Sequence, residues 1–308
     1  MCIRDRHVPA QYATIQAAID ACDDGDIVTV ADGVYSGPGN ISLRIGPGAA
    51  GLPRGILLRS ANGPESCVID CTRPPGWTWS RGIAFNGGED GTTVFRGFTV
   101  RNAWLNVGSG AAIMVSRSAP VIENCILENN TTGNSGGAIF CWNASPTIRD
   151  CTIRNNVATK VGGAIFCEES SAPSIIHCTI TGNRAGGGAT FGYGGAIHLE
   201  ENSSAKIIGC EIANNRARIG GAIQCQRWSD GAAILDCLIR DNVADEGGGG
   251  IHCHEASPTI EGCTITGNTA LWGGGLYLEE GNAAVERCVI ADNTAQQMGG
   301  GILSVSYT

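Results

Sequence analysis

Residues 147–167 read Thr147-Ile-Arg-Asp-Cys-Thr-Ile-Arg-Asn-Asn-Val-Ala-Thr-Lys-Val-Gly-Gly-Ala-Ile-Phe-Cys167, and this stretch decides the fold. Its apolar runs are two to four residues long, and Gly, Asn and Asp lie between them. Short apolar runs between turn-forming residues are typical of short β-strands, and no helical period of apolar residues is present. We therefore expect several short strands joined by tight turns.

This stretch is one copy of a repeat that continues to the end of the chain. The motif Cys-x-[Ile/Leu]-x-x-Asn occurs seven times at intervals of 25 to 32 residues, and a Gly-Gly-[Ala/Gly]-[Ile/Leu] motif follows each copy. Helical repeats of about 33–47 residues are too long for this unit. Three short strands in about 26 residues predict one coil of a parallel β-helix, in which each coil stacks about 4.8 Å from the last. The predicted fold is therefore all-β, a single-stranded parallel β-helix solenoid of roughly nine or ten coils.

Two positions in each coil are dominated by Gly, Asn and Asp: the residue before the motif cysteine and the residue before the motif asparagine. These residues tolerate a positive φ, so we expect both positions at sharp corners between strands. The motif asparagine is the same in every copy, and its stacked side-chain amides are expected to form a structural hydrogen-bonded ladder. The ladder residues are Asn130, Asn156, Asn183, Asn215, Asn242, Asn268 and Asn293.

A different pattern precedes the repeats. Thr14 is expected to be the N-cap of a short helix that covers the open end of the first coil. One face of that helix carries Ile15, Ala18, Ile19 and Cys22. Residues 27–30 (Ile-Val-Thr-Val) are expected to begin the sheet.

The chain divides into four segments on these patterns. Residues 1–6 match nothing that follows, and we expect them to be a non-native leader. Residues 7–35 are expected to form the N-terminal cap and first coil, residues 36–117 irregular coils, and residues 118–308 the regular repeats. Because the sequence stops within a repeat, we expect a fragment that is truncated at its C-terminus.

The segment from Tyr12 to Tyr35 resembles the opening "Y-x-T-I-Q-x-A-I-D-A-x-x-x-G-D-x-V-x-V-x-x-G-x-Y" that is frequent in the right-handed parallel β-helix, or pectin-lyase-like, superfamily. The repeats resemble those of bacterial polymorphic outer-membrane proteins, which pair Gly-Gly-Ala-Ile with Phe-x-x-Asn. Here Leu or Ile replaces the Phe in every copy. The resemblance implies a right-handed β-helix in a secreted or cell-surface, outer-membrane-associated protein.

The chain has 15 cysteines. Four of them follow the Gly-Gly-Ala-Ile motif by two positions, and leucine takes this position in other coils, so this column is expected to point inward. Stacking places neighbouring Cα atoms about 4.8 Å apart, within the disulfide range of about 4.4–6.8 Å. Free stacked thiols and some oxidised pairs both remain open. No spacing predicts a zinc site, and we expect no metal and no cofactor.

The strand after Gly-Gly-Ala should alternate, so that every second side chain points outward. Those positions carry aromatic, His, Glu and Gln side chains, the mixture that a sugar-binding groove requires. The expected ligand-binding residues are Phe166, Tyr193, His198, Glu200, Gln226, His252, His254, Tyr277 and Glu279. The candidate catalytic residues are Glu168, Glu200, His198 and His254, because stacked carboxylates beside imidazoles suit glycosidic-bond cleavage. A long insertion, residues 186–193, adjoins this face. The simpler alternative is a solvated polar face with no ligand.

Composition narrows the function. The net charge is −9 and the only lysines are Lys160 and Lys206, which argues against a nucleic-acid partner. No apolar run approaches the roughly 18 residues of a transmembrane helix. We expect a repeat protein that recognises a polysaccharide or cell-surface glycan. The alternatives are a carbohydrate-active enzyme, a polysaccharide lyase or glycoside hydrolase, that uses the His/Glu face, and a purely structural spacer.

Overall fold

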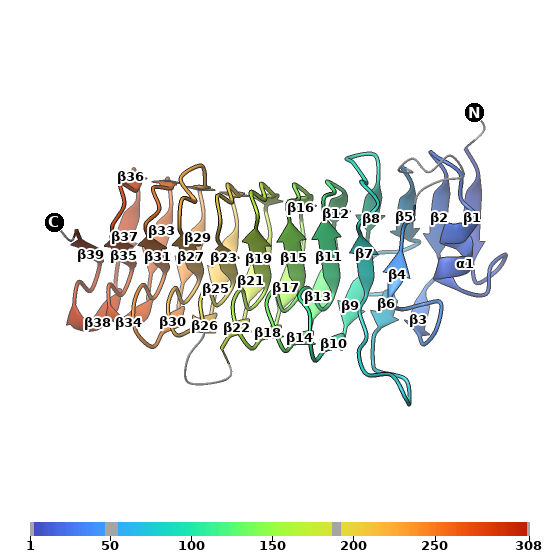
Figure 1. Cartoon of the computed structure of the whole chain (residues 1–308), viewed down its shortest axis with the longest axis horizontal. Helices are drawn as coiled ribbons and strands as arrows, with labels where there is room; N and C mark the ends of the chain where they lie inside the picture. Colours follow the sequence, from blue (N-terminus) through green and yellow to red (C-terminus); the bar gives the residue numbers. More distant parts are fainter. Residues whose placement is uncertain (1–2, 47–54, 187–191, 307–308) are drawn as a thin grey trace.

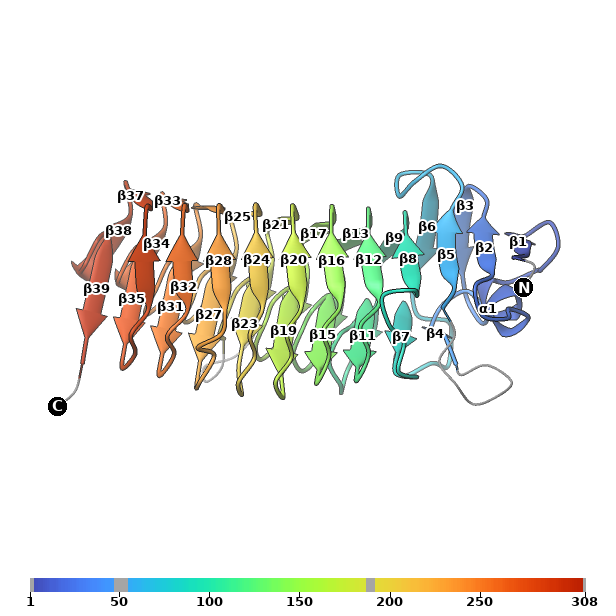
Figure 2. The ribbon, with the colours of Figure 1, turned by 90° about the horizontal axis from the view of Figure 1, so that it is seen from above.

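Successive coils of the chain stack into a long solenoid, with the two termini at opposite ends (Figure 1). The computed structural model describes residues 3–46, 55–186 and 192–306. Four parallel sheets run along the solenoid axis, and each is built from one strand of each successive coil. Figure 2 shows this stacking from a second direction. The predicted all-β parallel β-helix is confirmed.

Within each of the four sheets, the strands follow one another in chain order. Sheet 1 contains β1 (Asp5–Val8), β2 (Ile27–Val30), β5 (Leu57–Ser60), β8 (Val94–Arg96), β12 (Val121–Glu123), β16 (Thr147–Arg149), β20 (Ser174–Ile176), β24 (Lys206–Ile208), β28 (Ala233–Leu235), β32 (Thr259–Glu261) and β36 (Ala284–Glu286). Sheet 2 contains β3 (Gly33–Ser36), β6 (Cys67–Asp70), β9 (Thr99–Arg101), β13 (Ile126–Glu128), β17 (Thr152–Arg154), β21 (Thr179–Thr181), β25 (Glu211–Ala213), β29 (Leu238–Arg240), β33 (Thr264–Thr266) and β37 (Val289–Ala291). Sheet 3 contains β10 (Trp104–Leu105), β14 (Thr131–Thr132), β18 (Val157–Ala158), β22 (Arg184–Ala185), β26 (Arg216–Ala217), β30 (Val243–Ala244), β34 (Thr269–Trp272) and β38 (Thr294–Met298). Sheet 4 contains β4 (Leu43–Arg44), β7 (Ile83–Phe85), β11 (Ile113–Ser116), β15 (Ile139–Trp142), β19 (Ile165–Glu168), β23 (Ile197–Leu199), β27 (Ile223–Gln226), β31 (Ile251–His254), β35 (Leu276–Glu279) and β39 (Ile302–Val305).

Sheet 3 is the part of the coil that the repeat pattern does not predict. The pattern predicts three strands per coil, and sheet 3 adds a fourth that is mostly two residues long. In one coil it is β18, which lies between the ladder residue Asn156 and the positive-φ Gly162. Two residues between two bends are too few to show an alternating pattern, so this strand leaves no sign in the sequence.

Both predicted corner columns adopt a positive φ. Every one of the fourteen positions has a φ between 48° and 67°. The first column is Asn124, Asp150, His177, Gly209, Asp236, Gly262 and Arg287, and the second is Asn129, Asn155, Gly182, Asn214, Asp241, Gly267 and Asp292. This left-handed conformation turns the chain sharply from one sheet to the next, which confirms the corner prediction.

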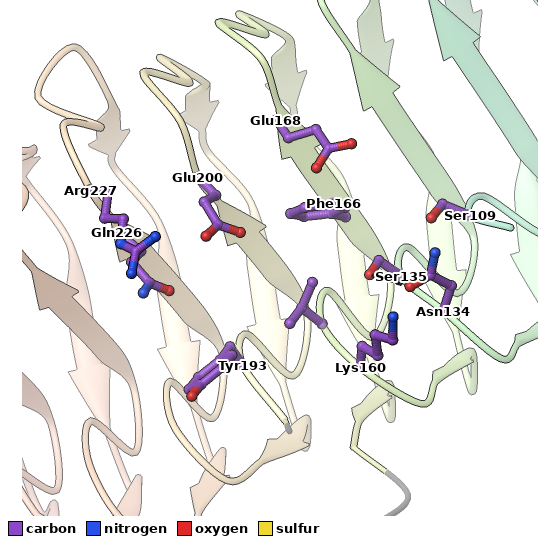
Figure 3. Close-up of a pocket in the computed structure, with 11 residues that line it drawn as sticks. Ser109, Asn134, Ser135, Lys160, Phe166, Glu168, Tyr193, Glu200, Gln226 and Arg227 are labelled. Atoms are coloured by element: carbon purple, nitrogen blue, oxygen red, sulfur yellow. Dashed lines mark hydrogen bonds between the residues drawn. The ribbon is translucent and has the colours of Figure 1, made fainter. Parts of the chain in front are cut away.

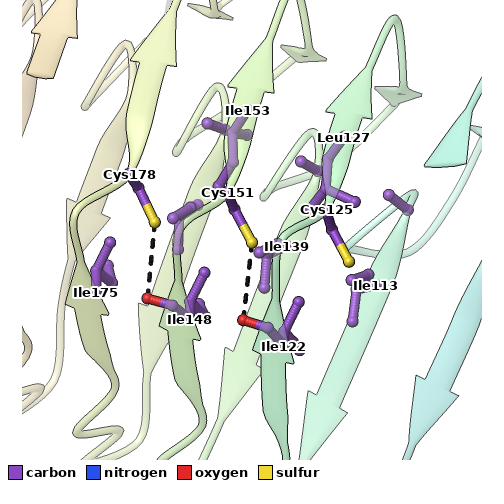
Figure 4. Packing of buried hydrophobic residues seen from close by; sticks show 14 of the residues in the cluster. Ile113, Ile122, Cys125, Leu127, Ile139, Ile148, Cys151, Ile153, Ile175 and Cys178 are labelled. Atoms are coloured by element: carbon purple, nitrogen blue, oxygen red, sulfur yellow. Dashed lines mark hydrogen bonds between the residues drawn. The ribbon is translucent and has the colours of Figure 1, made fainter. Parts of the chain in front are cut away.

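Columns of identical side chains fill the interior. Ile148 pairs with Ile175 in sheet 1, Ile153 with Ile180 in sheet 2, and Ile165 with Ile197 in sheet 4, and all of these side chains are fully buried. Figure 4 shows this packing around the cysteine column. Because the pairing is in register, each buried side chain packs against an identical one on the next coil.

The motif asparagines form a continuous buried ladder. The Nδ2 of Asn130 donates to Oδ1 of Asn156 at 2.9 Å, and the same bond recurs from coil to coil as far as Asn293. Each Nδ2 also donates to a backbone carbonyl of the preceding coil, and from Asn156 onward each Oδ1 also accepts the backbone N–H of the preceding ladder asparagine. The buried amides are therefore satisfied on all sides.

The cysteines are free thiols throughout the described residues, and all of them except Cys288 are buried. The single S–H of each motif cysteine lies within reach of two carbonyl acceptors, one two residues earlier and one on the preceding coil, as Cys151 shows with Arg149 and Ile122. The second column, which includes Cys141 and Cys167, also points inward, as expected.

Helix α1 (Ile15–Asp20) lies over the N-terminal end of the solenoid (Figure 1). Thr14 is its N-cap, as predicted, and the Oγ1 of Thr14 accepts the N–H of Ala17 at 3.2 Å. Strand β1 extends this cap beyond the expected boundary at residue 7, because Asp5 and Arg6 pair with β2. The guanidinium of Arg6 is buried against the carboxylate of Asp26, which anchors the strand. No helix in the described part of the chain has the length and apolar character that a membrane crossing needs.

Candidate functional site

The candidate site is a groove of about 410 Å³ on the outer side of sheet 4 (Figure 3). Its walls come from coils that are consecutive in space but about 26 to 32 residues apart in sequence. The residues that line the groove are Ser109, Asn134, Ser135, Lys160, Val161, Phe166, Glu168, Tyr193, Glu200, Gln226 and Arg227.

One wall is the end of sheet 4. Glu168 is the last residue of β19, Glu200 directly follows β23, and Gln226 is the last residue of β27. The strands are paired in register, Cys167 with Leu199 and Leu199 with Cys225, so these three polar side chains occupy the same position on successive coils. The stacking alone builds this row.

The opposite wall consists of the loops that join sheet 3 to sheet 4. Lys160 and Val161 lie in one such loop, and Tyr193 in the next forms a β-bridge to Val161. Arg218 holds the Tyr193 side chain, because its guanidinium donates to the Tyr193 hydroxyl at 3.0 Å. Of the long insertion 186–193, residues 187–191 lie outside the described residues.

The column that we expected to point outward and to line a sugar-binding groove is largely buried. Phe166 is 5% exposed, His198 0% and His252 4%. The side chains alternate along the strand as predicted. However, the ring of Tyr193 covers His198, with 5.9 Å between the ring centroids. Phe166, on the preceding coil, stacks on His198 with 5.4 Å between the ring centroids. His198 therefore points outward as expected, but loops and stacked neighbours cover its side chain and leave it 0% exposed.

His198 acts on the groove through Glu200. Its Nε2 lies 3.3 Å from Oε2 of Glu200, within reach for the Nε2–H to donate. This interaction lowers the pKa of Glu200 in spite of partial burial. Nδ1 of His198 is buried and has no hydrogen-bond partner among the described residues.

Glu168 has the opposite character. Its burial, and next the negative charges of Glu201, Glu200 and Glu169, raise the pKa of Glu168 to about 7. Near neutral pH this carboxyl is therefore protonated in a large fraction of molecules and can donate a proton, whereas Glu200 is ionised. The groove thus holds one acid and one carboxylate on neighbouring coils.

The remaining predicted residues gather outside the groove, on the next two coils. Nδ1 of His254 lies 3.2 Å from Oε2 of Glu279, and Nε2 of His252 lies 3.4 Å from the same oxygen. Burial lowers the pKa of His252, and the two histidines, His252 first, lower the pKa of Glu279. Tyr277 lies against His252, with 4.8 Å between ring centroids. The structure therefore separates the nine predicted ligand-binding residues into two groups.

Several groove residues were missed from the sequence, namely Ser109, Asn134, Ser135, Lys160 and Val161. All of them lie outside sheet 4, in loops whose positions no strand pattern fixes. The one available sign was Lys160, since lysine is rare in this chain.

Glu169 and Glu201, which directly follow Glu168 and Glu200, adopt φ values of 55° and 54°, an uncommon conformation for glutamate.

The comparisons with known proteins concern the fold. A family model described as "Right handed beta helix region" matches residues 81–257 and 163–306. No curated protein sequence matches the chain. Among solved structures, pectate lyase Pel9A is similar, with a TM-score of 0.56 and 14% identity over 99% of this chain and 79% of that chain.

Two further structures are less similar. Alginate lyase from Paenibacillus sp. has a TM-score of 0.43 and 14% identity, covering 97% of this chain and 99% of its own. Pectin methylesterase from carrot has a TM-score of 0.40 and 13% identity, covering 99% of this chain and 88% of its own. At these identities the likeness is one of solenoid architecture.

Proposed function

This chain belongs to the right-handed β-helix family, and we propose that its groove over sheet 4 binds a segment of a polysaccharide. The observation that carries the proposal is the lining of the groove. The half-buried ring of Tyr193 lies among polar groups from successive coils, whereas Phe166, also in the lining, is 5% exposed and is stacked between Phe140 and His198. Sugar rings present an apolar face and a rim of hydroxyls, which this combination can bind by stacking and by hydrogen bonds.

The shape of the groove supports a polymer rather than a small free sugar. The groove runs across the coils of Phe166, Glu200 and Gln226, so its polar groups repeat at the coil spacing of about 4.8 Å. Lys160 and Arg227 bring positive charge to a groove that also contains two glutamates. Pectate lyase Pel9A, which shares the fold, is named for a polysaccharide substrate.

We place the protein outside the cell, secreted or attached to the cell surface. The resemblance of its repeats to those of bacterial polymorphic outer-membrane proteins supports this location. Fractionation of cells that express the full-length gene tests it, and recovery of the protein in the cytoplasm alone would overturn it.

A specific observation favours a second function, the cleavage of a glycosidic bond. The pKa values of Glu168 and Glu200 are shifted in opposite directions, and such pairs commonly mark a general acid and its partner carboxylate. In this reaction Glu168 would protonate the leaving oxygen as the glycosidic C–O bond breaks. Glu200 would attack the sugar carbon or take a proton from the attacking water.

A glycan array combined with a reducing-end assay distinguishes the two functions. The wild type, Tyr193→Ala, Glu200→Gln and the control Glu128→Gln, which lies on sheet 2, are compared. For a binding protein, Tyr193→Ala loses at least about tenfold in affinity, Glu200→Gln changes affinity by less than about tenfold, and no reducing ends appear. For an enzyme, the wild type releases reducing ends and Glu200→Gln abolishes the release. If the wild type neither binds nor cleaves any glycan, the proposal fails.

A further inference from the structure

We propose that His254, Glu255 and Glu280 form a binding site for a divalent transition-metal ion, with Zn²⁺ as the best fit. One ligand atom from each residue lies within 4.8 Å of the other two. The three residues lie where strands β31 and β35 of sheet 4 end. These two strands belong to coils that follow the coils of the groove along the solenoid axis. The proposal is independent of the polysaccharide function.

The coil stacking brings these residues together. His254 ends β31 and Glu279 ends β35, and the two are register partners. Glu255 and Glu280 follow them directly, with φ values of 50° and 52°, and the N–H of Glu255 donates to the carbonyl of Glu279 at 3.0 Å. Glu255 and Glu280 are therefore equivalent residues of successive coils, in the same backbone conformation.

The two carboxylates lack a counter-charge. Some other surface glutamates pair with arginines, as Glu211 does with Arg240 and Glu128 with Arg154. Among the described residues, neither Glu255 nor Glu280 has an ion-pair partner. Like charges opposite each other on neighbouring coils repel, and a cation bound between Glu255 and Glu280 would relieve that repulsion.

A carboxylate orients the histidine. With Nδ1 of His254 3.2 Å from Oε2 of Glu279, the Nδ1–H can donate to that oxygen, which leaves Nε2 of His254 free to bind a metal. Metal-binding histidines usually have such a carboxylate behind them, because it fixes the ring and its tautomer. Glu279 is thus a positioning residue, whereas His254, Glu255 and Glu280 supply the ligand atoms.

A second histidine also contacts Glu279. Nε2 of His252 is buried and makes no hydrogen bond in the described part of the chain, although it faces Oε2 of Glu279 at 3.4 Å. Nδ1 of His252 lies 2.8 Å from Oε1 of Gln224 on the preceding coil. The carboxylate of Glu279 therefore lies between two imidazoles, and the oxygen that orients His254 is held in place from both sides.

The donor set selects the class of metal. One imidazole and two carboxylates suit Zn²⁺ and its neighbours, whereas Ca²⁺ prefers six to eight oxygen ligands. His254 is half-buried and both glutamates are exposed, so the carboxylates can rotate to metal–oxygen distances of about 2.0–2.2 Å and water can complete the coordination. No metal was expected from the sequence because these ligands share no short motif. Glu280 is 25 residues after Glu255 and approaches it only through coil stacking.

Calorimetric titration of the full chain with ZnCl₂ and with CaCl₂ tests the site. The variants are His254→Ala and the pair Glu255→Gln with Glu280→Gln. The matched control is the pair Glu169→Gln with Glu201→Gln, which changes glutamates of the same backbone conformation on earlier coils. We expect one variant-sensitive Zn²⁺ per chain that binds at least about tenfold more tightly than Ca²⁺. Both site variants should weaken Zn²⁺ binding at least about tenfold, and the control should leave it unchanged.

Co²⁺ substitution distinguishes this site from the cysteines. Ligation by nitrogen and oxygen gives weak visible bands, whereas a thiolate ligand adds an intense near-ultraviolet charge-transfer band. The proposal is overturned if Zn²⁺ does not bind, if the site variants bind it as the wild type does, if Ca²⁺ binds equally well, or if the variant-sensitive Co²⁺ spectrum shows the thiolate band. Circular dichroism of each variant establishes that the solenoid is folded before the titration is compared.

Discussion

Glu168 and Glu200 occupy the same position on neighbouring coils, yet the pKa of one carboxyl is raised to about 7 and that of the other is lowered. Only Glu200 has a histidine beside it, His198 at 3.3 Å. Glu168 is instead partly buried, and three other glutamates lie near it. Phe166 and His198 occupy equivalent positions on the two coils. The difference between phenylalanine and histidine there thus gives two equivalent carboxyls different protonation states.

The raised pKa of Glu168 makes stability depend on pH. In the unfolded chain this carboxyl ionises near its ordinary pKa of about 4.3, whereas in the fold it ionises near 7. Its favourable neutral form is therefore fully present below the unfolded pKa and is lost as the pH rises through 7. We expect Glu168→Gln to have the Tm of the wild type at pH 4 and a higher Tm at pH 8.5, measured by thermal denaturation. An equal Tm difference at both pH values would contradict the assignment.

The asparagine ladder should be sensitive to the loss of one rung. Asn215 is fully buried and donates to Asn242 while its Oδ1 accepts from Asn183. Asn215→Ala leaves the buried backbone N–H of Asn183 without its acceptor and removes one of the two donors to Oδ1 of Asn242, so we expect a loss of about 1–3 kcal/mol in the free energy of unfolding, measured in urea. The neighbouring corner residue Asn214 has a φ of 56°, and Asn214→Gly should be close to neutral because glycine adopts that φ freely. Equal losses in the two variants would show that the ladder amide has no special role.

The buried thiols should be unreactive in the folded protein. Burial raises the pKa of Cys67 to about 12, so this thiol is protonated at pH 8, and the reactive thiolate is scarce. We expect slow reaction of the native protein with a disulfide reagent and rapid reaction of most of the 15 cysteines once it is denatured without reductant. Mass spectrometry that finds several disulfides in the purified protein would refute this prediction.

Tyr193 should protect His198 from modification. His198 is 0% exposed under the ring of Tyr193, whereas the side chain of His254 is 31% exposed. We expect diethyl pyrocarbonate to modify His254 but not His198 in the wild type, and to modify both in Tyr193→Ala, as read by peptide mass mapping. Modification of His198 in the wild type would show that the ring does not cover it.

The coil could be predicted because its determinants are local and repeated. Asn129 and Asn155 mark bends by their residue type alone, and the positive φ at both positions follows from the chemistry of asparagine. Register follows as well, since stacking the motif isoleucines aligns every other column. Burial of the outward face could not be predicted in this way. Whether His198 meets solvent depends on the loop that carries Tyr193, and an alternating strand pattern contains no information about that loop.

Only part of the groove lining could be predicted from the sequence. Glu168 and Glu200 belong to the repeat, so their stacking was predictable from the column that they share. Lys160 and Ser135 reach the groove from loops between sheets 3 and 4, and sheet 3 itself was not foreseen. The groove residues that lie in loops between the sheets are therefore the ones that the pattern of a single repeat does not predict.

The hydrogen bonds between the stacked asparagines all run in one direction. From Asn130 to Asn268, one N–H of each amide donates to Oδ1 of the C-terminal neighbour, so from Asn156 to Asn293 each Oδ1 accepts from the N-terminal neighbour. The amide dipoles therefore add along the solenoid axis, with the positive end at Asn293, much as peptide dipoles add along a helix. Each bond also polarises the next, so the column acts as a single electrical element that spans the coils rather than as a set of separate contacts. A solenoid built from near-identical coils, whose sheets alone carry little net dipole, thereby acquires an axial electric polarity from one side chain per turn.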